Sequence, residues 1–133
     1  MAAPAQPASR RPVFDVVSST QLPRVDVLFT YQQAPGDLVD AATRAGARGL
    51  VIAAAGSGAV SVAQADAVDA ARRAGIPVVV SSRVAHGSLT ASDVPKGTIP
   101  SGTLSPVKAR ILLMLSLARG DSPAELAQVF RTY

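Results

Sequence analysis

The 133 residues are enough for one domain with a sizeable core, which must be aliphatic because 48% of the residues are hydrophobic and only 4% are aromatic. The chain has no cysteine, which excludes a disulfide framework and a thiolate zinc site. The formal net charge is +4, but Arg10 and Arg11 lie in a Pro/Ala-rich stretch and the other basic residues are scattered, without interleaved aromatics. Nucleic acid is therefore not an expected partner.

Residues 1–12 contain two late arginines and no apolar run, unlike a secretory signal peptide. We expect residues 1–20 to be a disordered leader or linker and residues 21–133 to form the domain. No apolar run approaches the ~18 residues of a membrane span, so a membrane is not an expected partner either. The compartment is unknown, with a cytoplasmic location as the default.

Strands are predicted at residues 24–30, 49–55 and 76–81, with a short fourth strand near 98–99. The second is a continuous apolar run, which is typical of a parallel strand covered on both faces. Helical segments separate the first three strands, as in βαβ units. The sequence therefore predicts an α/β domain of three layers: a parallel sheet of three to four strands flanked by about four helices, Rossmann-like in its organisation.

Capping signals mark the first two helices. Asp37 is expected to cap the first helix. Ser61 and Gln64 have the spacing of a capping box at the start of the second, with Val62 and Val68 facing inward.

The segment 101–120 is the element around which the chain is organised. Ser105 is a helix cap, Pro106 takes the first helical position, and Gly120 is the expected left-handed stop. Six of the seven residues from 111 to 117 are large and apolar, so this helix needs cover on more than one side. A last helix begins at a second capping box, and its apolar face comprises Leu126, Val129, Phe130 and Tyr133.

Ligands of open parallel sheets bind beyond the carboxyl ends of the strands, which here are followed by residues 31–36, 55–61 and 81–100. Gly56-Ser-Gly58 leads toward a helix N-terminus, and its amides could hold an anion or a carboxylate. The alternative is that these residues only form a tight turn between a strand and a helix.

Other polar residues lie at the end of the third predicted strand. Ser81 and Ser82 could satisfy buried backbone groups, and Arg83 could pair with a carboxylate or anchor a loop. His86 is the only histidine, so no metal site is expected, and a lone loop histidine is usually solvated. Asp93 lies in a long loop and could reach a pocket, although a surface position is favoured. These residues do not combine a nucleophile with a base and its orienting group.

Several motifs occur in order along residues 13–133: Leu22-Pro-Arg-Val-Asp-Val-Leu, Gly49-Leu-Val-Ile, Gly56-Ser-Gly, Val80-Ser-Ser-Arg-Val and Ser101-Gly-Thr-Leu-Ser-Pro-Val-Lys-Ala-Arg. Together they resemble the C-terminal domain of bacterial L-asparaginases, and most of all the type II asparaginase/glutaminase branch, whose members are often periplasmic. The resemblance implies an amidohydrolase that converts asparagine, and often glutamine, to the acid and ammonia without a cofactor.

The resemblance also implies which groups lie elsewhere. In the family the nucleophilic threonine, a second threonine, and the assisting lysine and aspartate belong to an N-terminal domain, whose motifs are not found in these residues. We therefore expect an asparaginase N-terminal domain or a neighbouring subunit as partner, and a chain that is inactive alone.

The family's C-terminal domain helps to form intimate dimers and lends substrate-contacting residues to a neighbouring subunit. The matching positions are Ser57, Gly58 and Ala59, with Asp93 as the carboxylate nearest to a loop glutamate of the family. Ala59 replaces the family's asparagine, and type II members often have asparagine at position 57. The expected partners are thus a small amino-acid substrate and further copies of the chain.

Two other hypotheses remain open. In the first, the chain is a non-catalytic α/β module that self-associates or binds a small acid at the strand ends. In the second, it is an inert truncated remnant.

Overall fold

A computed structural model describes residues 14–15, 21–84 and 87–133. Its elements, in chain order, are β1 (Val25–Phe29), α1 (Asp37–Arg44), β2 (Gly49–Ala54), α2 (Val62–Arg73), β3 (Val78–Ser82), β4 (Ile99–Pro100), α3 (Pro106–Arg119) and α4 (Pro123–Thr132). The predicted leader over residues 1–20 lies almost wholly outside the described residues and stays a prediction.

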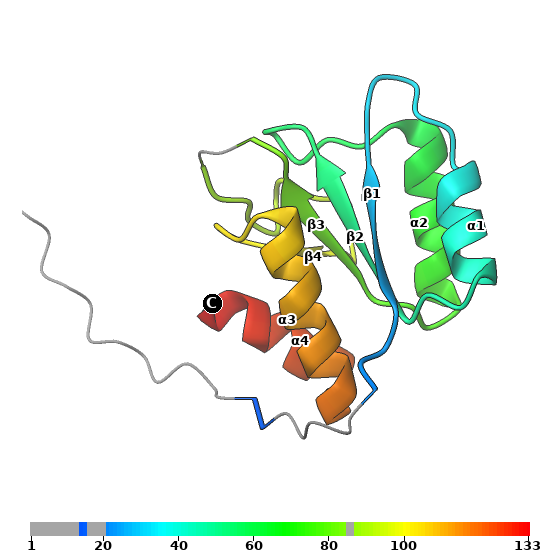
Figure 1. The fold of residues 1–133 in the computed structure, drawn as a ribbon. Coiled ribbons are helices and arrows are strands. Elements are labelled where there is room, and N and C mark those ends of the chain that lie inside the picture. The colour runs from blue at the N-terminus through cyan, green and yellow to red at the C-terminus, as the bar shows by residue number, and fades with distance from the viewer. Residues whose placement is uncertain (1–13, 16–20, 85–86) are drawn as a thin grey trace, which may run out of the picture.

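The sheet is parallel, with the strand order β1-β2-β3-β4 (Figure 1). Helices α1 and α2 cover one face, and α3 and α4 cover the other. The predicted three-layer α/β class and the short fourth strand are therefore confirmed. Strand β2 lies between β1 and β3 and is buried at every residue, as its continuous apolar run predicts.

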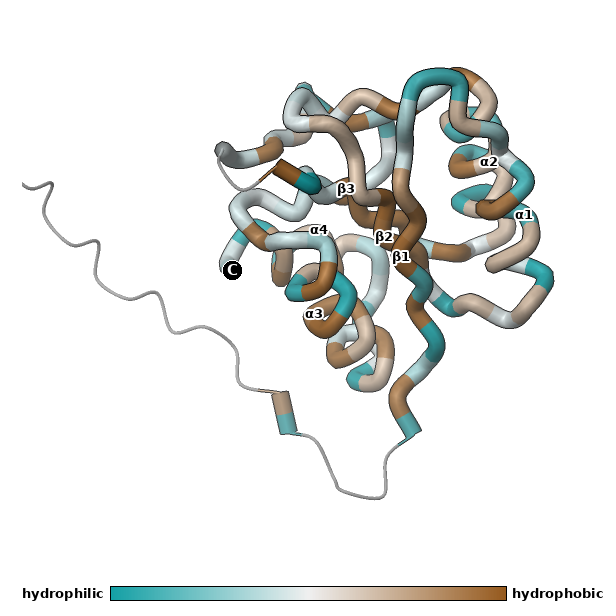
Figure 2. Tube along the Cα trace, turned by 45° about the horizontal axis from the view of Figure 1, so that its top comes forward, coloured by the Kyte–Doolittle hydropathy of each residue, from teal (hydrophilic) through white to brown (hydrophobic). Residues whose placement is uncertain are grey.

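Side chains of the strands alternate between two hydrophobic clusters. Leu50, Ile52 and Val80 face α1 and α2, whereas Val51 and Val79 face α3 and α4. Figure 2 shows the hydrophobic residues concentrated along β1, β2 and β3, between the two helical layers. Aliphatic side chains make most of both clusters, in line with the composition.

Helix α3 begins and ends where its sequence predicts. The Ser105 hydroxyl accepts from the Lys108 amide, Pro106 is the first helical residue, and Gly120 has φ 85°. Ala109, Leu112 and Leu113 are buried against the sheet and α4. The box predicted for α4 also forms, because Ser122 and Glu125 exchange both capping bonds.

Two predictions about the other helices are wrong. Helix α1 has Gly36 as its N-cap with no side-chain cap bond, and Asp37 instead places its charge in the first turn. In α2 the Ser61 hydroxyl accepts from the Gln64 amide, but Gln64 is itself buried and its Nε2 donates to the carbonyl of Phe29 at 3.0 Å. Val62, predicted to face inward, is 80% exposed, because this bond turns the Gln64 face of α2 to the core.

Candidate functional site

The carboxyl ends of β1, β2 and β3 lie at one edge of the sheet (Figure 1). We call this the carboxyl edge. The strands follow one another in simple sequential order, so the chain never reverses direction across the sheet. Ligand crevices of open α/β sheets form where such a reversal splits the crossovers to opposite sides. The described strands therefore lack this topological site for a crevice, and a loop follows the carboxyl end of each of β1, β2 and β3.

The glycine turn after β2 is a closed turn. The Gly58 amide donates to the carbonyl of Ala55 at 2.8 Å, and Gly58 has φ 77°. Ser57 and Ala59 are exposed on either side of it. Helix α2 starts only at Val62, so the Gly58 amide serves the turn and not a helix N-terminus.

The structure brings two of the predicted site residues together. A Cβ placed on Gly58 would lie 2.5 Å from the backbone oxygen of Asp93 and 3.3 Å from Cδ2 of Leu89. The glycine turn therefore rests on the loop that follows β3. The contact is made by the backbone of Asp93 and not by its carboxylate.

The Asp93 carboxylate is engaged within its own loop. Its Oδ2 accepts from the Thr90 amide and from the Thr90 hydroxyl, each at 2.7 Å. These two bonds hold the pKa of Asp93 below its ordinary value, since they stabilise the ionised carboxylate. The Asp93 side chain is solvent-exposed, which agrees with the surface position considered for it from the sequence.

Two serines, one from each of two motifs, share one acceptor. The Ser81 hydroxyl donates to the carbonyl of Leu104 at 2.6 Å, and the Ser101 hydroxyl donates to the same carbonyl at 3.0 Å. Both serines are fully buried. The prediction that serines at the end of the third strand satisfy backbone groups is confirmed for Ser81, which helps to fix the start of α3 beside β3.

Arg83 and Ser82 end the pairing of β3. The Arg83 amide donates to the carbonyl of Ala54 at 2.9 Å, while its side chain is exposed. The Ser82 hydroxyl accepts from the Val84 amide at 3.1 Å. His86 lies outside the described residues.

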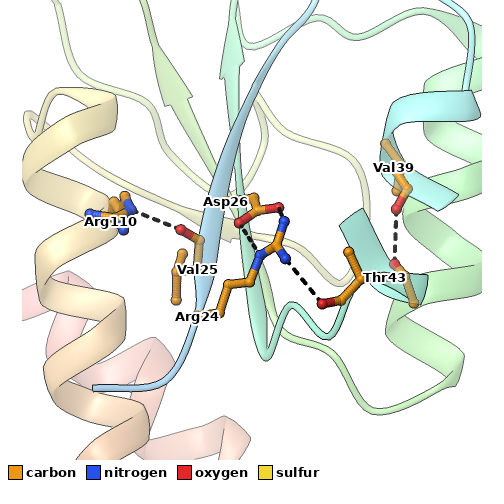
Figure 3. Close-up of polar contacts among 7 residues, drawn as sticks. Arg24, Val25, Asp26, Val39, Thr43 and Arg110 are labelled. Atoms are coloured by element: carbon orange, nitrogen blue, oxygen red, sulfur yellow. Dashed lines mark hydrogen bonds and ion pairs between the residues drawn. The ribbon is translucent and has the colours of Figure 1, made fainter. Parts of the chain in front are cut away.

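Several structural arginines could not be found from the sequence. Arg110 of α3 donates to the carbonyl of Val25, and Arg24 bonds both Asp26 and the carbonyl of Ala45 (Figure 3). Arg72 of α2 donates from Nε to the carbonyl of Gly97 at 2.7 Å. Apart from the neighbouring Asp26 carboxylate, these acceptors are backbone oxygens of distant segments, which leave no pattern in the sequence.

A cavity of about 550 Å³ lies at the opposite end of the sheet. Its lining includes Pro77, Thr98, Leu117 and Leu126, near the amino ends of β3 and β4. It does not include the predicted site residues Ser57, Gly58, Ala59 and Asp93. Within the described ranges no group of three or more His, Cys, Asp or Glu side chains could hold a metal, and no helix could cross a membrane.

Residues 24–130 match the family described as the Glutaminase/Asparaginase C-terminal domain. Over 122 residues the chain is 38% identical to L-asparaginase 2 of Bacillus subtilis, covering 90% of this chain and 32% of that protein. It is 36% identical over 124 residues to a probable periplasmic L-asparaginase of Haemophilus influenzae, covering 90% and 36%. A crystal structure of a probable cytoplasmic L-asparaginase from Campylobacter jejuni matches with a TM-score of 0.83 and 37% identity, covering 91% of this chain and 40% of that one. The chain thus spans about a third of the length of these curated relatives.

Proposed function

This chain belongs to the glutaminase/asparaginase C-terminal domain family, and on that premise we propose that it works as one part of an L-asparaginase/glutaminase-like amidohydrolase. The reaction is the hydrolysis of L-asparagine to L-aspartate and ammonia. The observation that carries the proposal is the match of nearly the whole chain to L-asparaginases in both sequence and fold. The domain itself we take to be residues 21–133.

The exposure of the carboxyl edge indicates which part of the enzyme carries the nucleophile. An amide-hydrolysing site needs an activated nucleophile, a proton donor and exclusion of bulk water. The row of loops at this edge is open to solvent, with Ser57 and Ala59 exposed and the carboxylate of Asp93 already bonded to Thr90. We therefore assign the nucleophilic attack to the part of the enzyme that corresponds to the other two thirds of the relatives.

In this assembly the glycine turn and the loop after β3 lie against the active site of a neighbouring subunit. The substrate is a small amino acid, asparagine or glutamine. Ala59 has only a methyl group at the position where the resemblance places an asparagine, so a polar contact from the turn must come from Ser57 or from backbone atoms. The partners are an asparaginase N-terminal domain and further copies of the same chain.

A chimeric enzyme tests the proposal. Residues 14–133 replace the matching segment of Bacillus subtilis L-asparaginase 2, and ammonia release from asparagine and from glutamine is measured. We expect a rate within about tenfold of the parent enzyme, equivalent to ~1.4 kcal/mol in the barrier. As a matched control, the corresponding segment of the Haemophilus influenzae relative is inserted at the same junction. An active control beside a folded, assembled but inactive chimera would overturn the proposal.

A second candidate function rests on the outer face of α3. Val107 and Ile111, one helical turn apart, are 65% and 47% exposed. A non-catalytic module that self-associates through this face would bury them. Sedimentation of the chain and of its Val107→Lys variant distinguishes the two: self-association that the variant abolishes, together with an inactive chimera, favours the module.

A further inference from the structure

The loop after β3 is anchored to the domain at both ends. The Leu89 amide donates to the carbonyl of Gly102 at 3.0 Å, and Arg72 holds the carbonyl of Gly97 at 2.7 Å. Between these bonds, Leu89 and Val94 are 4% and 8% exposed and belong to the cluster under α1 and α2. Residues 89–97 therefore run from the carboxyl edge toward the amino end of β4, and buried apolar contacts as well as hydrogen bonds hold them in place.

Within this loop, the carboxylate of Asp93 closes a turn. Its Oδ2 binds both the amide and the hydroxyl of Thr90, and its own amide donates to the carbonyl of Thr90 at 3.0 Å. Three hydrogen bonds thus join these two residues. They fix the backbone direction at Asp93, including the direction of its carbonyl.

The carbonyl of Asp93 lies directly against Gly58. A Cβ on Gly58 would be 2.5 Å from the oxygen and 3.2 Å from the carbonyl carbon, closer than side chains approach backbone atoms. Gly58 also has a positive φ of 77° that favours glycine. The turn that presents Ser57 and Ala59 therefore packs on the carbonyl that the Thr90–Asp93 turn orients.

We propose that Asp93 is a positioning residue, which sets the place of the 55–58 turn through its backbone while its carboxylate holds Thr90 and does not touch substrate. The inference rests on the proposed function, because it gives the turn a task at an amide-hydrolysing site. It revises the expectation that Asp93 would contact the substrate directly. The physical cause is that the same carboxylate oxygen already serves two donors of its own loop.

Hydrogen exchange at the Gly58 amide tests the inference in the chain alone. Asp93→Ala removes the acceptor for Thr90, so exchange at Gly58 should become about tenfold faster. Asp93→Asn keeps a side-chain oxygen that can accept from Thr90 and should restore slow exchange. Asp66→Ala, which removes an exposed carboxylate from α2, is the matched control and should leave Gly58 unchanged. Unchanged exchange at Gly58 in folded Asp93→Ala would overturn the inference.

If Asp93→Ala fails to fold, Thr90→Val provides the second variant. It removes the hydroxyl donor but keeps the Thr90 amide bond, so exchange at Gly58 should rise about threefold. Exchange at the wild-type rate in this variant would contradict the positioning role.

Kinetics of the chimera separate positioning from direct contact. We expect Asp93→Ala to lower kcat/KM about tenfold, mainly through KM, and Asp93→Asn to recover most of the loss. A carboxylate that binds the substrate would make the Asn variant as damaging as the Ala variant, and this result would overturn the inference. An inactive chimera whose Gly58 exchange still responds to Asp93→Ala would refute the proposed function and leave the positioning role intact.

Discussion

Nε of Arg110 in α3 donates to the backbone carbonyl of Val25 in β1 at 2.7 Å, across 85 positions of sequence (Figure 3). The Thr30 amide donates to the carbonyl of Ala53 in β2, and the Arg24 carbonyl accepts from the Arg48 amide just before β2. By alternation the carbonyls of Val25, Val27 and Phe29 point away from β2. The carbonyls of Val25 and Phe29 accept a side-chain donor, from Arg110 and from Gln64 respectively. These bonds occupy two of the acceptors that another strand would need in order to pair with the outer edge of β1.

Replacing Arg110 by Met should lower the free energy of unfolding by about 1–2 kcal/mol, because a charge-assisted bond to a strand carbonyl is lost. Urea denaturation measures the change. Arg131→Met is the control, since Arg131 is exposed and bonds only Gln128 among the described residues. It should cost less than about 0.5 kcal/mol. Equal losses in the two variants would show that the Val25 bond contributes little.

Phe14 links the segment before β1 to the C-terminal helix. The guanidinium carbon of Arg119 lies 4.4 Å from the centre of its ring, and the ring of Tyr133 lies 6.4 Å away. We expect Phe14→Leu and Arg119→Gln to show a coupling energy of about 0.5–1 kcal/mol in a double-mutant cycle. Arg119→Gln also breaks the bonds of Arg119 to Asp121, but this loss occurs both with Phe14 and with Leu at position 14, so it cancels in the cycle. Additive losses would contradict a cation–π contribution.

Gly36 allows α1 and α2 to approach closely. It has an ordinary φ of −80°, but an added Cβ would lie 2.8 Å from the Ala63 oxygen and 2.9 Å from the Ala67 Cβ. Gly36→Ala should therefore destabilise the fold by about 1–3 kcal/mol through overpacking alone. At Gly56 the new methyl group meets only the exposed side chain of Val84, at 3.3 Å. Thermal denaturation should show a distinctly smaller loss for Gly56→Ala, and the reverse order would contradict the account.

The bonds to Thr90 give Asp93 a testable pH dependence. Because they lower the pKa of Asp93 in the folded state, their contribution to stability is complete above the unfolded pKa of about 3.9. It is lost as the pH falls through the lower folded value. The difference in unfolding free energy between wild type and Asp93→Asn should thus be constant above about pH 5 and shift against wild type below about pH 4. A difference that does not change with pH would refute the lowered pKa.

Local signals were sufficient for the elements that build the sheet and α3. The apolar run of β2, the cap at Ser105 and the stop at Gly120 each act over a few residues, and each is confirmed. The side chains that decide which face of a helix is buried act over longer distances. Gln64 faces inward because its amide meets Phe29, 35 positions away, and no local pattern predicts that partner.

The meeting of Gly58 and Asp93 was predictable from the sequence, but the atoms that make the contact were not. Gly58 and Asp93 follow neighbouring parallel strands, so their meeting at the carboxyl edge agrees with the sequence-based location. The orientation of the Asp93 carboxylate toward Thr90 depends on how residues 89–97 are anchored, through Leu89, Val94 and Arg72. These anchors are tertiary contacts and could only be seen in the structure.

Ammonia release by the purified 133-residue chain, with asparagine and with glutamine, tests most directly whether the nucleophile lies outside this domain. The account predicts no release above a heat-denatured control, since the described site residues supply positioning and not an activated nucleophile. Release well above that control would contradict the account. It would direct attention to Ser57, Ser82 and Thr103 as hydroxyl nucleophiles of the chain itself.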